Sequence, residues 1–246
     1  MLDTASLSTA FLVYVGLIAA ILAGMLPRAF RGAGKVVALG FLAIWLAYAG
    51  VFSWFALLRD PSLRPPGATL LVGPVFAVLI LITGVLPAGR RLAASFSVAL
   101  LIGFQLFRVG PELTITELYY HGIAPRLLTL PGGNVELLVA LSAPIFAWMA
   151  ARGTIGRRIA FGWNVLGLLS LFNVAARSVL SAPGPLNFLH TEVPNLAFVD
   201  FPFGLIPGFM APLAFAIHML TFRALSLASR SSRAQWNDRS ASAAST

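Results

Sequence analysis

The chain has 246 residues, of which 59% are hydrophobic and 10% are charged. Its mean hydropathy of +0.89 excludes an ordinary water-soluble domain, in which apolar residues make up about half of the chain. A formal net charge of +9 would suit a nucleic-acid partner in a soluble protein, but in so apolar a chain we expect no nucleic-acid binding. The lipid bilayer is the expected partner, and the chain is predicted to be an integral membrane protein.

Seven apolar stretches are about as long as a membrane-spanning helix. We therefore predict an all-α fold, a polytopic membrane bundle that forms a single domain over residues 1–226. The segment 227–246 is predicted to be a disordered basic tail. The expected spans are 8–26, 36–58, 69–87, 92–110, 134–151, 159–180 and 203–226.

Basic residues predict the orientation of these spans. Twelve of the 17 Lys and Arg residues follow the first, third, fifth and seventh spans, and cytoplasmic loops are enriched in Lys and Arg. The N-terminus is therefore expected outside and the C-terminus in the cytoplasm. The first span follows Asp3 and no basic segment precedes it, so we expect an uncleaved span and not a signal peptide.

Two longer connections, 111–133 and 181–202, are expected on the outer side. Gly110 and Pro111 predict a break, after which 111–121 forms a short helix that is kinked away or lies at the membrane interface. The second connection mixes prolines with phenylalanines, so it is expected to fold back irregularly over the helix ends. It is interpreted as either a connector or a lid.

Two polar stripes rise toward the outer ends of the predicted fourth and sixth spans. Gln105, Arg108 and Glu112 are spaced i, i+3 and i+7, and Ser170, Asn173 and Arg177 repeat that spacing. A central arginine costs roughly 2.5–3.5 kcal/mol on insertion scales, so both stripes are expected to face protein or water and not lipid.

Four further residues are candidates for the polar interior. Asn134 and Glu136 begin the fifth span, where they suit a helix cap and a first-turn acid; alternatively, Glu136 points inward toward Arg108. Asn164 lies near the inner end of the sixth span. His218 lies in the seventh span, where it serves either as hydrogen-bonded packing or as part of a site.

Metal and cofactor chemistry finds less support in the sequence. Glu117 and His121 are spaced i, i+4 and, with His190 of the other outer loop, are weak candidates for metal ligands. A retinal Schiff base is argued against, because the only lysine, Lys35, is not in the last span. A bis-histidine haem is argued against too, because no second histidine lies at the depth of His218. No cofactor is identified, and the sequence leans away from an enzyme.

Several of these residues belong to a set of motifs within roughly 104–225. The motif residues are Phe107, Arg108, Glu112, Gly132, Asn134, Glu136, Trp163, Asn164, Asn173 and His218, with "LSAP" at 141–144 and 180–183 and "FPF" at 201–203. With these motifs, the sequence resembles a functionally uncharacterised family of bacterial multi-pass inner-membrane proteins. It departs from the pattern of that family at Gly110, where a proline is usual, and at Gly133, which replaces an arginine. The resemblance implies location in the inner membrane and a polar interior built from the polar residues of these motifs.

Three functional hypotheses follow. In the first, an outward-facing polar cavity among the fourth to seventh spans binds or passes a small solute or ion, with Arg108 and Arg177 as anion-pairing or gating groups. In the second, the chain is a structural or accessory subunit that packs against a membrane-protein partner. In the third, it is a metal-dependent membrane enzyme or sensor.

Overall fold

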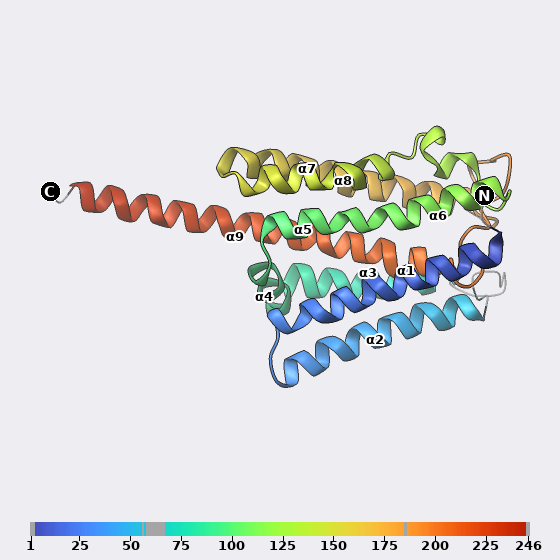
Figure 1. Cartoon of the computed structure of the whole chain (residues 1–246), viewed down its shortest axis with the longest axis horizontal. Coiled ribbons are helices and arrows are strands. Elements are labelled where there is room, and N and C mark those ends of the chain that lie inside the picture. The colour runs from blue at the N-terminus through green and yellow to red at the C-terminus, as the bar shows by residue number, and fades with distance from the viewer. Residues whose placement is uncertain (1–2, 56, 58–66, 185, 245–246) are drawn as a thin grey trace.

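The computed structural model describes residues 3–55, 57, 67–184 and 186–244, with the side chains of 68, 69 and 231–244 outside the description. Within this part of the chain the secondary structure is helical and contains no strand, which confirms the all-α prediction (Figure 1). Residues 56 and 58 of the second predicted span, and residues 245–246 of the predicted tail, lie outside the described residues.

Long helices run side by side (Figure 1). The α-helices are α1 Thr4–Met25, α2 Ala33–Trp54, α3 Gly67–Ile80, α4 Pro87–Ser95, α5 Val98–Phe104, α6 Val109–Tyr120, α7 Glu136–Ala151, α8 Thr154–Leu180 and α9 Ala211–Ala244. Short 3₁₀ turns are η1 Leu26–Arg28, η4 Gln105–Arg108, η5 Arg126–Leu128 and η6 Leu130–Gly132, and π-helical turns are η3 Leu81–Val85 and η7 Ile206–Met210. The two longer described connections lie between α6 and α7 and between α8 and η7.

Five of these helices are long and apolar enough to cross a membrane, so the chain is a helical membrane protein. The five are Thr4–Arg28, Ala33–Trp54, Val98–Tyr120, Thr154–Leu180 and Ile206–Arg230. A sixth arises if Leu70–Val85 and Pro87–Ser95, which bend by 72° at their junction, count as one broken span. The fifth predicted stretch, 134–151, corresponds to α7, a shorter apolar helix of 16 residues.

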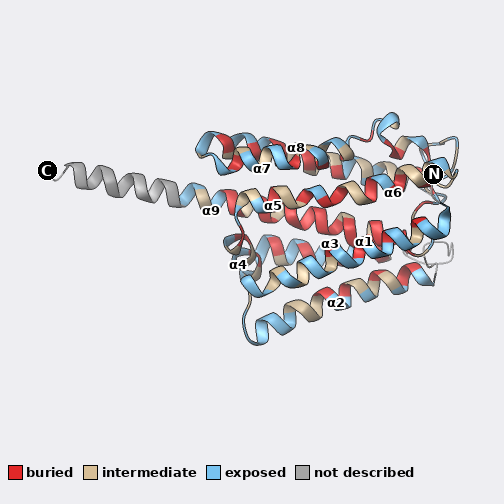
Figure 2. Cartoon of the chain, in the orientation of Figure 1, coloured by how far each residue is buried: buried red, intermediate tan, exposed pale blue. Residues whose placement is uncertain are grey.

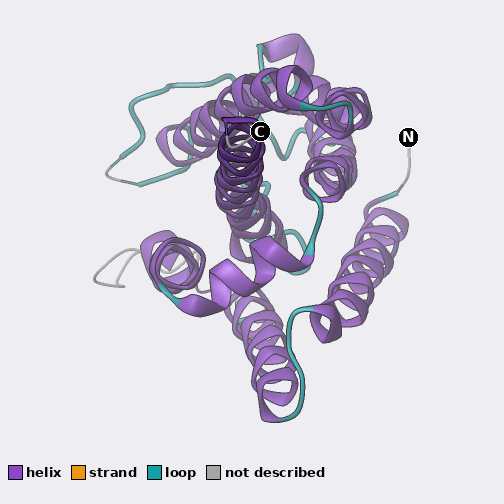
Figure 3. Ribbon diagram, turned by 90° about the vertical axis from the view of Figure 1, so that its left-hand side faces the viewer, coloured by secondary structure: helices purple, strands orange, loops and turns teal. Residues whose placement is uncertain are grey.

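The last helix lies at the centre of the bundle, as the end-on view shows (Figure 3). Of the apolar window in Ile206–Arg230, 67% is buried, against 17% of that in Thr4–Arg28 (Figure 2). Side chains of α9 therefore meet neighbours from most of the other helices. The helical assignment of α9 continues to Ala244, so it includes residues 227–244, for which the sequence predicted a disordered tail.

The expected break after Gly110 is wrong. α5, η4 and α6 follow one another as a single candidate span, Val98–Tyr120, so the predicted fourth span of 92–110 begins too early and ends too early. Pro111 lacks the N–H that would bond the carbonyl of Phe107 four residues earlier, and this carbonyl accepts a hydrogen bond from the Tyr14 hydroxyl instead (2.6 Å). A neighbouring helix thus satisfies the carbonyl that proline frees, and the span continues.

Gly110 allows the ring of Tyr14 to approach the backbone of the Val98–Tyr120 span closely. A Cβ atom at this position would lie 2.3 Å from Cε1 of Tyr14, so a side chain there would collide with the ring. Gly110 therefore allows α1 to approach the Val98–Tyr120 span closely at Tyr14.

The bend between α3 and α4 is held by α9. Nη1 of Arg223 donates to the carbonyls of Thr83 (2.7 Å) and Leu86 (3.2 Å), which lie at the end of the π-helical turn and at the start of α4. Pro87 has no N–H to donate to the Thr83 carbonyl four residues earlier, and the guanidinium of Arg223 supplies a donor there. The Leu86 carbonyl accepts from the Gly89 N–H as well (3.2 Å). α4 then lies across the end of the bundle with Arg90 and Arg91 exposed.

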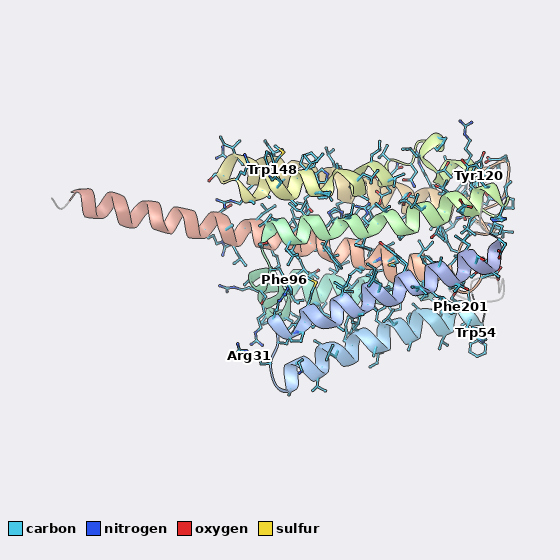
Figure 4. The ribbon with its side chains drawn as sticks, in the orientation of Figure 1. Arg31, Trp54, Phe96, Tyr120, Trp148 and Phe201 are labelled. Carbon is cyan, nitrogen blue, oxygen red and sulfur yellow. The ribbon has the colours of Figure 1, made fainter. Side chains whose placement is uncertain are left out.

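The helix connections place the basic loops at one end of the bundle. α4 and the turns between α1 and α2 and between α7 and α8 lie at the end opposite to the N-terminus (Figure 1). Arg31, Phe96 and Trp148 mark this end, while Tyr120 and Trp54 mark the other (Figure 4).

Candidate functional site

The structure brings seven of the nine predicted interior residues together at the meeting of η4 and α6 with α7, α8 and α9. All seven are buried, with exposed fractions between 0% and 8%. We call this set the polar network: Gln105, Arg108, Glu112, Asn134, Glu136, Asn164 and His218.

Arg108 is the centre of the polar network. Its Nη2 forms an ion pair with Oε2 of Glu136, the first residue of α7, and makes no other hydrogen bond within the described part of the chain. Its Nη1 lies 3.1 Å from Nε2 of His218. One guanidinium therefore joins the Val98–Tyr120 span to α7 and α9.

This geometry assigns the tautomer of His218. A guanidinium has only donors, so Nε2 of His218 must accept, and the ring must be neutral with its proton on Nδ1. Nδ1 lies 2.8 Å from Oδ1 of Asn164, which accepts that proton's hydrogen bond. The amide nitrogen of Asn164 donates in turn to the carbonyl of His218 (3.1 Å), so α8 is bound to α9 by a reciprocal pair.

Gly167 makes room for this pair. A Cβ atom on Gly167 would lie 2.7 Å from Cε1 of His218, so the histidine ring fits only against a glycine. Gly167 was not singled out from the sequence, although its spacing of three from Asn164 puts both on one face of α8.

The second arm of the polar network passes through Asn134. Its Nδ2 donates to Oε2 of Glu112 (2.8 Å) and to the carbonyl of Leu128 (2.8 Å), and its Oδ1 accepts from the backbone N–H of Glu136 (3.1 Å). Asn134 is not the N-cap of α7 that the capping interpretation expected, because α7 begins at Glu136 and its N-cap is Val135. Asn134 nevertheless holds the Glu136 N–H at the start of α7, and it ties Glu112 to the polar network. Glu136 lies in the first turn and points inward toward Arg108.

Two oxygens of the polar network have no hydrogen-bond partner among the described residues. They are Oε1 of Gln105, whose Nε2 donates to the carbonyl of Ala214 (3.2 Å), and Oε1 of Glu136. Both are acceptors, and their side chains are 0% and 1% exposed. Buried acceptors without a donor are uncommon, so these oxygens suit a hydrogen-bond donor or a cation.

The remaining two predicted residues do not join the polar network. Asn173 is exposed on α8, and Nη1 of Arg177 donates to the carbonyls of Leu127 (3.3 Å) and Gly132 (3.1 Å). The spacing of Asn173 and Arg177 predicts that they share one face of α8, but it does not predict whether that face points into the bundle. The buried face of α8 contains Asn164 instead, and Arg177 holds the loop that leads to Asn134.

The weak metal candidates are not brought together. His190 is exposed, and no group of three or more His, Asp or Glu side chains close enough to hold a metal occurs in the part of the chain that the structure describes. Glu117 and His121 remain one turn apart at the end of α6. The metal-dependent hypothesis therefore gains no support from the geometry.

The loop 181–205 folds back over the helix ends, as expected. The backbone N–H of Leu196 donates to the carbonyl of Ile123 (3.1 Å), and the ring of Phe201 packs on Trp54 at the end of α2 with 5.2 Å between centroids (Figure 4). The backbone N–H of Arg126 donates to Oε1 of Glu192 (2.6 Å). The connections between α6 and α7 and between α8 and α9 are thus joined to each other.

The contact between Glu192 and Arg126 predicts a pH-dependent loop. The hydrogen bond from the Arg126 backbone lowers the pKa of Glu192 below its ordinary value. A carboxyl with a lowered folded-state pKa stabilises the folded loop fully above its unfolded-state pKa and loses that contribution as the pH falls through the folded-state pKa. Hydrogen–deuterium exchange at the Arg126 amide, corrected for intrinsic rates, is expected to rise on acidification in the wild type. Glu192→Gln should flatten this dependence, and an identical rise in both proteins would contradict the assignment.

One family model matches the chain, over residues 65–226, and is described as "Domain of unknown function (DUF8737)". The match includes every residue of the polar network and leaves α1 and α2 outside. Neither the curated proteins nor the solved structures contain a match to the chain.

Proposed function

Since the chain belongs to the DUF8737 family, whose description assigns no function, we propose one from the polar network. The protein is an integral membrane protein that binds or passes a small solute or ion at this network, between the Val98–Tyr120 span, α7, α8 and α9. Arg108 is the ion-pairing group, and Glu136 and Glu112 are its counter-charges.

The observation that carries this proposal is the shared arginine. Ionisable groups inside membrane helices are expensive, and they mark ligand or ion pathways by default. Arg108 is 4% exposed, and its guanidinium contacts both Glu136 of α7 and His218 of α9. One side chain therefore links the Val98–Tyr120 span to two other helices. A ligand that competes for any of these contacts changes how the three helices are held.

The proposal includes a topology. We place seven crossings in the bundle, with the bent α3–α4 pair and the short α7 included, the N-terminus outside and the C-terminus in the cytoplasm of a bacterial inner membrane. The gathering of basic connections at one end of the bundle supports this orientation. Glu112, Asn134 and the loop 181–205 then lie toward the outer side.

The test is ligand-dependent stability of the purified protein in lipid nanodiscs. The unfolding temperature is measured with sodium, potassium, ammonium, chloride, phosphate and acetate salts and with neutral amino acids. A ligand that binds only the native state stabilises it by RT ln(1 + [L]/Kd), so at least one compound should raise the midpoint of the wild type. Glu136→Gln should lose that shift, and Glu192→Gln, altered in the exposed loop, should keep it. Equal responses of the wild type and Glu136→Gln across the panel would contradict the proposal.

A second candidate function is supported by the burial of the first two helices. Only 17% and 22% of the apolar windows in α1 and α2 are buried, and the family match begins after them. An accessory subunit would cover such helices with a membrane-protein partner. Purification from native membranes in a mild detergent should then yield one partner at fixed stoichiometry, and a monodisperse chain alone would exclude this role.

A further inference from the structure

The charges of the polar network do not balance. Arg108 contributes one positive charge, Glu112 and Glu136 contribute two negative charges when ionised, and the tautomer assigned above leaves His218 neutral. The sum is one negative charge in the interior of an apolar bundle. Burying an uncompensated charge is strongly unfavourable, so the network requires one further positive charge.

Neighbouring elements do not supply that charge. Arg177 of α8 uses its Nη1 for two backbone carbonyls. Within the described ranges Arg177 forms no ion pair with Glu112 or Glu136, and the ion pair of Glu136 is the one with Arg108. Tyr14 of α1 donates to the Phe107 carbonyl, and Arg126 of η5 is exposed. The charged group that acts on Glu112 is Arg108, which Glu136 and His218 also contact. On the same helix, Glu117 has a buried Oε2 with no hydrogen-bond partner among the described residues.

The unpartnered oxygens indicate the same deficiency. Oε1 of Gln105 and Oε1 of Glu136 accept no hydrogen bond from any described residue, although both side chains are almost fully buried. Two acceptors of the network therefore lack a donor, although Nη2 of Arg108 also has no hydrogen-bond partner among the described residues beyond its ion pair. A proton that arrives with a water molecule supplies donors and a positive charge, whereas an anionic ligand supplies neither.

Glu112 is the carboxylate that is free to take the proton. Glu136 is in ion-pair contact with Arg108 through Oε2, whereas Glu112 accepts a hydrogen bond from the neutral amide of Asn134 on its Oε2. Arg108 attracts Glu112 electrostatically as well, but the described residues show no ion-pair contact between the two. Glu112 is also the most exposed member of the polar network, at 8%, one helical turn beyond Arg108 toward the end covered by loop 181–205.

We propose that the polar network takes up one proton, held on the Glu112 carboxyl group, and that the proton is the ion this site binds. In that step the Glu112 carboxylate and a proton from the outer solution form a carboxylic acid, with the new O–H bond on Oε1. The Asn134 amide continues to donate to Oε2, which becomes the carbonyl oxygen. The inference rests on the proposed function and names its ligand.

Infrared difference spectroscopy of the whole protein in nanodiscs tests this inference. The wild type is expected to show the carbonyl stretching band of a protonated carboxylic acid at neutral pH, and to lose it as the pH rises. Glu112→Gln should abolish the band. Glu136→Gln should abolish it as well, because Arg108 and Glu112 then form a neutral pair. Glu192→Gln should keep it.

Glu112→Asp is the control for a folding defect in Glu112→Gln. It keeps a carboxyl group, so it should shift the carbonyl band without removing it. Absence of the band in the wild type, or its persistence in Glu112→Gln or Glu136→Gln, would overturn the inference. The spectrum requires neither solute nor flux. A ligand effect on stability without the band would therefore defeat the proton alone, whereas the absence of both would defeat the proposed function as well. A titrating band without any effect of the other ligands would leave the proton as the ion of the proposed function.

Discussion

Arg108→Met is expected to lower the free energy of unfolding by about 3–5 kcal/mol, the range measured when one partner of a buried ion pair is removed. The loss is large because the substitution leaves Glu136 ionised and buried, and leaves Nε2 of His218 without a donor. Equilibrium unfolding in mixed micelles, with increasing denaturing detergent, measures the change. Arg91→Met on α4 is the matched control, since Arg91 is exposed and should change stability by no more than about 0.5 kcal/mol.

The double variant Arg108→Met/Glu136→Met separates the ion pair from the loss of packing. With both partners removed, no unpaired charge remains between η4 and α7, so the double variant should be more stable than the sum of the two single effects predicts. Residues in direct contact show coupling energies of about 0.5–3 kcal/mol. Additive single and double effects would contradict the contact between Arg108 and Glu136.

Asn164→Leu is expected to destabilise the protein by about 1–3 kcal/mol, the cost of leaving a buried donor without its acceptor. Asn164 accepts from Nδ1 of His218 and donates to the His218 carbonyl, so leucine removes both bonds between α8 and α9. Unfolding in the same mixed micelles measures the loss.

Asn173→Leu provides the control on the same helix. The exchange is chemically identical, but Asn173 is exposed on α8, where leucine suits a lipid-facing surface. Its stability should equal or exceed that of the wild type. Equal destabilisation by the two substitutions would show that the histidine pair does not hold α8 on α9.

Most of the helical architecture follows from the apolar stretches alone. Six of the seven predicted stretches fall on a helix or helix pair, because membrane-length apolar runs are distinctive. The exception is the fourth stretch, where Gly110 and Pro111 predicted a break. Tyr14 satisfies the carbonyl that Pro111 frees, and this contact joins residues 93 positions apart in the chain. Local sequence carries no signal of so distant a partner.

The candidate site was partly predictable for a related reason. The stripe of Gln105, Arg108 and Glu112 is buried because a charged arginine within an apolar span has to face protein. The stripe containing Asn173 was less informative, because a neutral amide near a helix end is tolerated on either face. Asn164 joined the network through its contact with His218, and that contact depends on the packing of α8 against α9.

The break predicted after Gly110 affects how the residues from Gln105 to Tyr120 are interpreted. From the sequence, Glu117 and His121 belong to a separate interfacial helix, whereas Arg108 and Glu112 belong to a span. In the structure the same continuous helix includes Arg108, Glu112 and Glu117. Glu112 is therefore one turn along a candidate span from Arg108, and Asn134 links it to the Leu128 carbonyl in the connection between α6 and α7.

The central claim is that Arg108 lies in the interior of the bundle and is shared by Glu136 and His218. An experimental density map of the protein in lipid nanodiscs tests it most directly. We expect the guanidinium to lie within hydrogen-bond distance of both side chains, with Asn164 on the far side of the imidazole. A map in which Arg108 faces lipid headgroups, with Glu136 and His218 apart, would contradict the account.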